Sequence, residues 1–230
     1  MRFAALASLS LGLTLTACDG GLNRDIAVGD AARDASGGFT VNGRIEVGAG
    51  AEVIGDLRTV NGSVRVGKGA RTRDLDSING SIALAEKVQS GGVATVNGAL
   101  SVGTGGRIGG SLGAVNGSIR GGGGTIVDGD VRTVNGQIEL RGVTVRGQVG
   151  NHAGDVRLLD GTLVEGDLVL AEPDHASTRS DAVVIGVGVQ VRGVLRASRP
   201  VRLFVHPSAR LGRIEGATAV AFEGTDVAGD

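Results

Sequence analysis

The sequence predicts an all-β protein, a single-stranded parallel β-helix (a solenoid) with three-sided coils of 18–19 residues. The first observation is a tripeptide, Val/Ile-Asn-Gly, that occurs six times, with its asparagines at positions 42, 61, 79, 97, 116 and 135. The steps between these asparagines are 19, 18, 18, 19 and 19 residues, which is too short for separate domains and typical of coils that stack on their neighbours. The second observation is the alternation of apolar and polar residues, as in Ser63-Val64-Arg65-Val66, which is typical of a strand with one buried face.

The coils can be aligned on the tripeptide. They span 41–59, 60–77, 78–95, 96–114, 115–133, 134–151 and 152–170, and the same step backwards gives 22–40. The fifth position of each coil is then always apolar: Ile26, Ile45, Val64, Ile82, Leu100, Ile119, Ile138 and Val156. A shorter six-residue period within the coil indicates three sides, so we expect a triangular prism in which like residues stack. At about 4.8 Å per coil, roughly ten coils would make a rod on the order of 50 Å long.

The asparagine column is the most conspicuous set of polar residues. We expect a buried amide ladder, in which each asparagine hydrogen-bonds the asparagine of the next coil and the following glycine relieves a corner with positive φ. The alternative is a row of ligands for a glycan or for ice. With Asn23, which has the same place in coil 22–40, the candidate ladder comprises Asn23, Asn42, Asn61, Asn79, Asn97, Asn116 and Asn135.

Residues 1–17 have the features of a signal peptide. Arg2 is positive, and the apolar run from Phe3 to Leu15 is too short to cross a membrane as a helix. The run leads into Leu15-Thr16-Ala17-Cys18, which resembles the lipobox of bacterial lipoproteins. The resemblance implies that cleavage leaves Cys18 as the first residue and that its thiol and amine are acylated. The chain would then be lipid-anchored in the bacterial cell envelope, at the inner or outer membrane, on its periplasmic or surface face, with residues 18–21 as a short lipidated tether.

The pattern is less regular after residue 170. Residues 171–182 are polar, contain Pro173 and are expected to loop out of the stack. Alternation then resumes, so we expect residues 183–230 to form the final coils and a C-terminal cap. Phe204 and Phe222 are expected to cover the last coil, because the open end of a solenoid has to be closed.

Short phrases at the corners carry a second family resemblance. Val53-Ile54-Gly55-Asp56-Leu57 and Val164-Glu165-Gly166-Asp167-Leu168 resemble bactofilins, the polymer-forming cytoskeletal proteins of bacteria. The phrase Val-Asn-Gly-x-Ile is also similar to the adhesin β-solenoids of bacterial surface proteins. Either resemblance covers about residues 22–170 of this chain. The first implies a polymer and the second a surface module; a lipoprotein signal departs from the usual cytosolic bactofilin.

No set of residues indicates catalysis, a cofactor or a metal. The third-side aspartates share their column with Ser111 and Gln148, so we expect a solvated face and not a calcium site, which needs about six to eight converging oxygens. These aspartates are Asp56, Asp74, Asp130 and Asp167. The three histidines lie in unrelated contexts, and only His175 is a candidate for the catalytic histidine of a hexapeptide-type acyltransferase. The glycine run 121–124 lacks the Gly-Lys-Ser/Thr of a P-loop and is expected to thin one coil for another surface to pack against.

The composition limits the partners. Lys and Arg number 23 against 24 Asp and Glu, a net charge of −1 that argues against nucleic acid. Tyr and Trp are absent, so the aromatic faces that usually bind sugars or bases are missing. We therefore expect a non-enzymatic, membrane-tethered structural or adhesin-like module; the alternatives are a hexapeptide-type acyltransferase and an envelope polymer-forming scaffold. The expected partners are the membrane, through the N-terminal lipid, and either further copies of the chain or an envelope protein or glycan.

Overall fold

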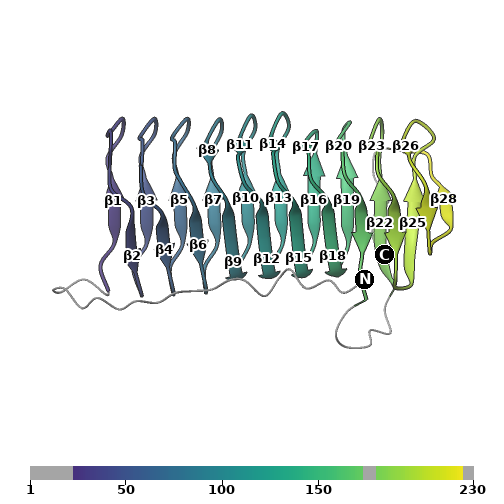
Figure 1. Ribbon diagram of the computed structural model, residues 1–230, viewed down its shortest axis with the longest axis horizontal. Helices are drawn as coiled ribbons and strands as arrows, with labels where there is room; N and C mark the ends of the chain where they lie inside the picture. The colour runs from purple at the N-terminus through teal and green to yellow at the C-terminus, as the bar shows by residue number, and fades with distance from the viewer. Residues whose placement is uncertain (1–22, 173–179, 225–230) are drawn as a thin grey trace.

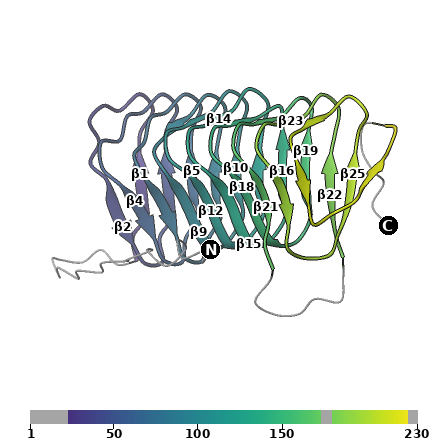
Figure 2. The same cartoon turned by 45° about the vertical axis from the view of Figure 1, so that its right-hand side comes forward.

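The chain folds into a straight rod of stacked coils (Figure 1). The computed structural model describes residues 23–172 and 180–224. All the secondary-structure elements in these residues are β-strands. The described part of the chain therefore contains no helix that could cross a membrane. The strands form three parallel sheets of 11, 7 and 10 strands. Figure 2 shows the coils following one another in one direction along the rod. The predicted all-β, three-sided parallel solenoid is confirmed.

The first sheet contains the predicted apolar columns. Its strands are β1 (Ile26–Val28), β3 (Ile45–Val47), β5 (Val64–Val66), β7 (Ile82–Leu84), β10 (Leu100–Val102), β13 (Ile119–Gly121), β16 (Ile138–Arg141), β19 (Val156–Leu159), β22 (Asp181–Ile185), β25 (Val201–Val205) and β28 (Ala219–Ala221). Ile26 pairs with Ile45, and the column continues through each coil to Val156. Alternate residues therefore face one interior, in which Ile45 and Ile138 are completely buried.

The second sheet has short strands of two residues. They are β8 (Gln89–Ser90), β11 (Arg107–Ile108), β14 (Ile126–Val127), β17 (Thr144–Val145), β20 (Leu163–Val164), β23 (Gln190–Val191) and β26 (Arg210–Leu211). The turn that leads into this side from the first sheet contains a residue with positive φ, for example 64° at Gly50, 69° at Gly69 and 58° at Lys87. Glycine suits this corner for the predicted reason, because it reaches positive φ without steric cost.

The third sheet leads each coil back to the tripeptide. Its strands are β2 (Gly38–Thr40), β4 (Leu57–Thr59), β6 (Leu75–Ser77), β9 (Val93–Asn97), β12 (Leu112–Asn116), β15 (Val131–Asn135), β18 (Val149–Ala153), β21 (Leu168–Leu170), β24 (Leu195–Ala197) and β27 (Ile214–Glu215). Paired residues are mostly 18 or 19 positions apart, as in Leu57 with Leu75 and Leu112 with Val131. Leu168 pairs with Leu195, 27 positions later, so one coil holds an insertion between β21 and β22. Residues 173–179 of that insertion lie outside the described part.

The glycine of the tripeptide is required by a close approach of two backbones. A Cβ added to Gly80 would lie 2.0 Å from the carbonyl oxygen of Gly62, and one on Gly117 would lie 1.8 Å from that of Gly98. None of these glycines has positive φ. The prediction that they relieve a left-handed corner was therefore wrong. Each glycine instead lets the carbonyl of the preceding coil pack directly against its Cα.

Gly121 does not open a recess in the rod. It is buried at an interior position where the neighbouring coils have Val102 and Leu140. A Cβ there would meet methyl groups of Val143 at 2.9 Å and Leu140 at 3.1 Å. The neighbouring side chains therefore fill the space, and the prediction of a thinned coil that receives another surface was wrong.

Phe204 faces outward from the first sheet. It alternates with Leu203, which is 1 % exposed, and it pairs with Val184 on one side and Val220 on the other. The prediction that Phe204 covers the last coil was therefore wrong. Phe222 packs its ring edge-on against His206, with ring centroids 5.7 Å apart. Residues 225–230 of the predicted cap lie outside the described part.

Replacing Gly80 by alanine should destabilise the rod, because the added Cβ would meet the Gly62 carbonyl oxygen at 2.0 Å. We expect the free energy of unfolding in urea to fall by about 2–3 kcal/mol, as for other overpacked sites. Gly113→Ala is the matched control, since no atom of the described residues lies within 4 Å of its Cβ position. Alanine should stabilise that strand by about 0.5–1 kcal/mol. Equal unfolding midpoints for the two variants would contradict the close-approach explanation.

Candidate functional site

The seven candidate asparagines lie in one row at the corner between the third and first sheets. Each Nδ2 donates to the Oδ1 of the asparagine one coil earlier: Asn42 to Asn23 (2.6 Å), Asn61 to Asn42, Asn79 to Asn61 and Asn97 to Asn79 (2.8 Å each), Asn116 to Asn97 (2.9 Å) and Asn135 to Asn116 (3.0 Å). All seven residues are exposed, whereas a buried row was predicted. An amide offers two N–H donors and two acceptor lone pairs. Each inner asparagine therefore keeps hydrogen-bonding capacity for solvent or a ligand.

A second column, of threonine and serine residues, lies on the inner side of the same corner and is buried. It was not predicted from the sequence. Its hydroxyls donate to a backbone carbonyl one coil earlier: Thr40 to Arg24 (2.8 Å), Thr59 to Gly43 (3.2 Å), Ser77 to Gly62 (3.2 Å), Thr95 to Gly80 (2.9 Å) and Thr133 to Gly117 (2.9 Å). The signal was present, because Thr or Ser precedes every tripeptide except the one after Ala114. The buried hydroxyls of this column need hydrogen-bond partners, and the carbonyls of the preceding coil supply them.

The third-side aspartates accept backbone hydrogen bonds from the next coil. Asp74 Oδ1 accepts from Gly92 N at 2.6 Å, Asp130 Oδ1 from Gln148 N at 2.7 Å, and Asp167 Oδ1 from Val194 N at 2.8 Å. Asp56 forms an ion pair with Arg58 at 3.2 Å. The prediction of a merely solvated face was therefore incomplete. Three of the four carboxylates connect consecutive coils where the chain enters the third sheet.

A buried arginine contacts the residue that continues the buried threonine column at its C-terminal end. Arg199 is 7 % exposed and forms an ion pair with Asp181. Its Nη2 donates to Asn151 Oδ1 at 2.5 Å and to the Gly154 carbonyl at 3.3 Å. Asn151 takes the place of the threonine in the buried column and donates to the Gly136 carbonyl at 2.8 Å. The cluster therefore links the coils on either side of the insertion, and its members are too far apart in the sequence to have been found there.

The other chemistry candidates are not assembled into a site. His152 lies on β18, and His206 Nδ1 contacts Ser208 Oγ at 2.8 Å. Cys18 and His175 lie outside the described residues. Within the described ranges, no three His, Cys, Asp or Glu side chains are grouped to hold a metal ion.

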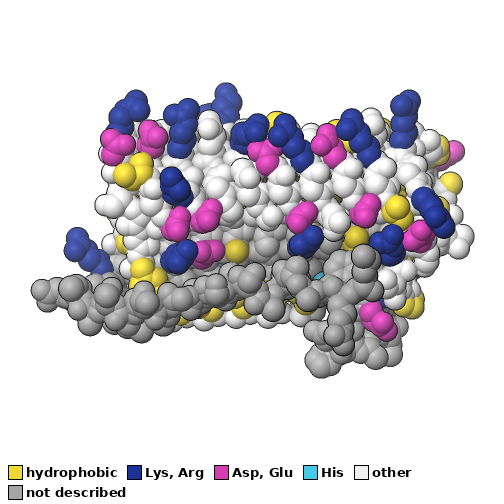
Figure 3. Space-filling model, in the orientation of Figure 1, with side chains coloured by type: hydrophobic (Ala, Val, Ile, Leu, Met, Phe, Trp, Pro, Cys, Tyr) yellow, Lys and Arg dark blue, Asp and Glu magenta, His cyan; other side chains and the backbone are white. Residues whose placement is uncertain are grey.

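Charged side chains are interspersed and form pairs across the coils (Figure 3). Arg107 and Arg146 share Asp128, at 2.8 and 2.7 Å. Lys68 lies 2.7 Å from Glu86, and its ammonium group holds the pKa of that carboxyl below the ordinary value by hydrogen bonding and charge. These exposed pairs contribute little to stability, and they leave the visible face without a field of one sign.

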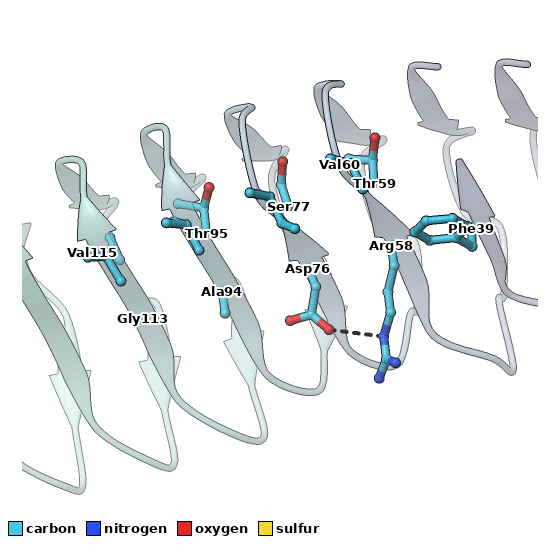
Figure 4. Close-up of a pocket in the computed structure, with 13 residues that line it drawn as sticks. Phe39, Arg58, Thr59, Val60, Asp76, Ser77, Ala94, Thr95, Gly113 and Val115 are labelled. Atoms are coloured by element: carbon cyan, nitrogen blue, oxygen red, sulfur yellow. Dashed lines mark ion pairs between the residues drawn. The ribbon is translucent and has the colours of Figure 1, made fainter. Parts of the chain in front are cut away.

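A groove follows the outer face of the third sheet across β4, β6, β9 and β12 (Figure 4). It has a volume of about 230 Å³. One side is the half-buried row that immediately precedes the asparagines, namely Val60, Ile78, Val96 and Val115. The other side consists of the outward residues Arg58, Asp76, Ala94 and Gly113, and Phe39 lies at one end. We call this feature the third-sheet groove. The sequence contains one indication of the groove. At the outward position of the third side, two successive coils have the small residues Ala94 and Gly113, whereas the coils before and after them have Asp76 and Arg132.

Comparisons with protein-family models, with curated proteins and with solved structures found no match to this chain. The structure shows a parallel β-solenoid, the kind of fold that both resemblances implied.

Thr95→Val should destabilise the rod more than Asn97→Ala. The Thr95 hydroxyl is buried, and its loss leaves the Gly80 carbonyl without its donor at 2.9 Å, at a cost of about 1–3 kcal/mol. Asn97→Ala removes hydrogen bonds that water can replace, and should cost about 0.5–1 kcal/mol. Urea unfolding measures both. Ala114→Thr is the complementary control and should increase the free energy of unfolding. If Asn97→Ala lowered that free energy more than Thr95→Val, the exposed amides would be the more important column for stability.

Proposed function

We propose that the protein is a non-enzymatic, membrane-tethered structural or adhesin-like rod of the bacterial cell envelope. The observation that carries the proposal is that the conspicuous polar columns join one coil to the next. Asparagine amides bond to amides, threonine hydroxyls to carbonyls, and aspartate carboxylates to backbone N–H groups. Such cross-coil bonds make each repeat depend on its neighbours. The polar residues thus stiffen the rod along its axis, as expected for a protein that acts as a spacer or carries a binding surface away from the membrane.

The proposed anchor lies close to the first coil. Cys18 precedes Asn23, the first rung of the asparagine row, by five residues. An extended chain spans at most about 3.3–3.6 Å per residue, so the row begins within roughly 18 Å of the cysteine. Several acyl chains on one residue would anchor the rod stably, because each buried methylene contributes about 0.8 kcal/mol. The tether is thus too short to let the rod move far from the membrane.

Lipidation is tested by growing expressing cells with labelled palmitate. Wild-type protein should carry the label, and Cys18→Ser should carry none, because the acylated atoms belong to that residue. The double variant Cys18→Ser/Ser36→Cys is the matched control: it keeps one thiol in the chain, at an exposed position outside the lipobox, and should also remain unlabelled. Undiminished label in Cys18→Ser would refute the anchor.

A polymer-forming scaffold is the second candidate, and the first coil of the rod favours it. The inward residues of β1, Ile26 and Val28, are only half-buried, whereas Ile45 and Val47 on β3 are buried. β1 is also the first strand of its sheet. An open strand edge with exposed apolar groups is a template for another chain. The acyltransferase alternative depends on His175, and no contact in the described part supports it.

End-to-end association is tested by sedimentation of Cys18→Ser and of Cys18→Ser/Ile26→Lys at the same micromolar concentration. The single variant should sediment as an oligomer, and the double variant as a monomer, because a lysine at Ile26 places a charge in the apolar end surface. The shared Cys18→Ser background makes coil 22–40 the only difference. Monomers in both samples would exclude stacking through the first coil.

A further inference from the structure

One wall of the third-sheet groove is apolar, and part of its floor consists of small residues. Val60, Ile78, Val96 and Val115 repeat once per coil along one side. On the floor, no atom of residues 23–172 or 180–224 lies within 4 Å of the position where a Cβ of Gly113 would be. The neighbouring outward residue of β9 is Ala94, which is similarly small. The groove therefore runs parallel to the rod axis, with an apolar wall along its length and small residues opposite that wall at Ala94 and Gly113.

Arg58, the one cation among the described residues that line the groove, is already paired with carboxylates. Arg58 lies 3.1 Å from Asp76 and 3.2 Å from Asp56. Burial raises the pKa of Asp76, and the negative charges of Asp74 and Asp56 act in the same direction, against the lowering effect of Arg58. An anionic ligand would meet these carboxylates and no unpaired cation at Arg58. The chemistry favours a neutral, apolar occupant.

The dimensions favour a single slender chain. The lining residues run from Phe39 to Val115 over five neighbouring strands of the third sheet, β2, β4, β6, β9 and β12, and four steps of about 4.8 Å make roughly 19 Å. The hydrocarbon core of a bilayer is about 30 Å thick and two acyl chains deep, so one acyl chain covers roughly 15 Å. A folded domain or a broad planar ligand would not enter a channel of about 230 Å³.

The N-terminal segment reaches the first coil at the Phe39 end of the groove. Thr40 Oγ1 donates to the Arg24 carbonyl at 2.8 Å, which fixes residue 24 beside the residue that follows Phe39. Cys18 precedes Arg24 by six residues, a span of at most about 22 Å. A group carried by Cys18 is therefore within reach of the groove, and no other segment outside the described residues is attached at this end of the rod.

We propose that the third-sheet groove binds one fatty-acyl chain of the lipid carried by Cys18. The proposal rests on the lipidation of Cys18 proposed above. An acyl chain joined through an ester or amide is neutral, matches the apolar wall in length and needs no cation at its head. Binding would hold the rod against its own anchor, with the third sheet turned toward the lipid, and would shield one chain from water whenever the protein leaves the bilayer.

The test uses cells fed a palmitate analogue that carries a terminal diazirine, followed by irradiation and peptide mapping of the full-length protein. Crosslinks should map to residues 93–96 and 112–115. Gly113→Leu should lower their yield by about tenfold, the effect of roughly two methylenes losing their burial. Ser101→Leu is the matched control: it adds the same side chain at an exposed position on β10 of the first sheet and should leave the yield unchanged. Ala94→Leu provides a second groove-filling variant, and circular dichroism melting checks that all three variants fold.

The outcomes separate the two proposals. Incorporated label whose crosslinks reach only lipids, or only a second copy of the chain, would overturn the groove assignment and leave the anchor intact. No incorporated label would overturn both. Crosslinks at 93–96 that persist undiminished in folded Gly113→Leu and Ala94→Leu would place the chain on the surface without using the groove.

Discussion

The close stacking of successive backbones is the constraint on which the rest of the structure depends. Parallel strands hold neighbouring coils about 4.8 Å apart, and at the tripeptide corner this leaves no room for a Cβ: one on Gly117 would lie 1.8 Å from the Gly98 carbonyl oxygen. Glycine must therefore recur once per coil. The same spacing brings equivalent side chains within hydrogen-bonding distance, so an asparagine or threonine that recurs with the glycine meets its own copy or the carbonyl below. The period of the sequence is thus a direct consequence of a steric requirement.

The contribution of each polar group to the stability of this rod depends on how deeply the group is buried. The asparagine row is continuous but exposed, so water competes for each amide. The threonine and serine column lies under the same corner, is almost completely buried and donates to backbone carbonyls of the preceding coil. Where the repeat changes, Asn151 replaces the threonine and Arg199 reaches it from a later coil, paired with Asp181. This cluster lets the stack continue past the insertion. Because a buried ion pair is costly unless its partners are all present, it also commits those coils to one arrangement.

The third-sheet groove and the proposed anchor suggest how one rod could be oriented. Ion pairs across coils lie on all three sides of the rod, and the third sheet also has an apolar strip that starts where the chain joins the tether. A lipid held along that strip would couple the position of the rod to the membrane without any additional domain. The exposed amides run beside the strip, so a ligand or a headgroup at this corner would meet apolar and amide groups together.

The period, the register and the three-sided solenoid could be predicted from the sequence, because they depend on the alternation within each coil and on the repetition of that pattern from coil to coil. The sequence also indicated the asparagine row, whose members recur at one position. It misassigned the burial of that row, the reason for the tripeptide glycine, and the role of Phe204. Those depend on which side of the backbone faces inward and on how closely two coils approach. The cluster of Arg199, Asp181 and Asn151 and the third-sheet groove could not be predicted, because both are made by side chains from different coils whose contacts no single repeat encodes.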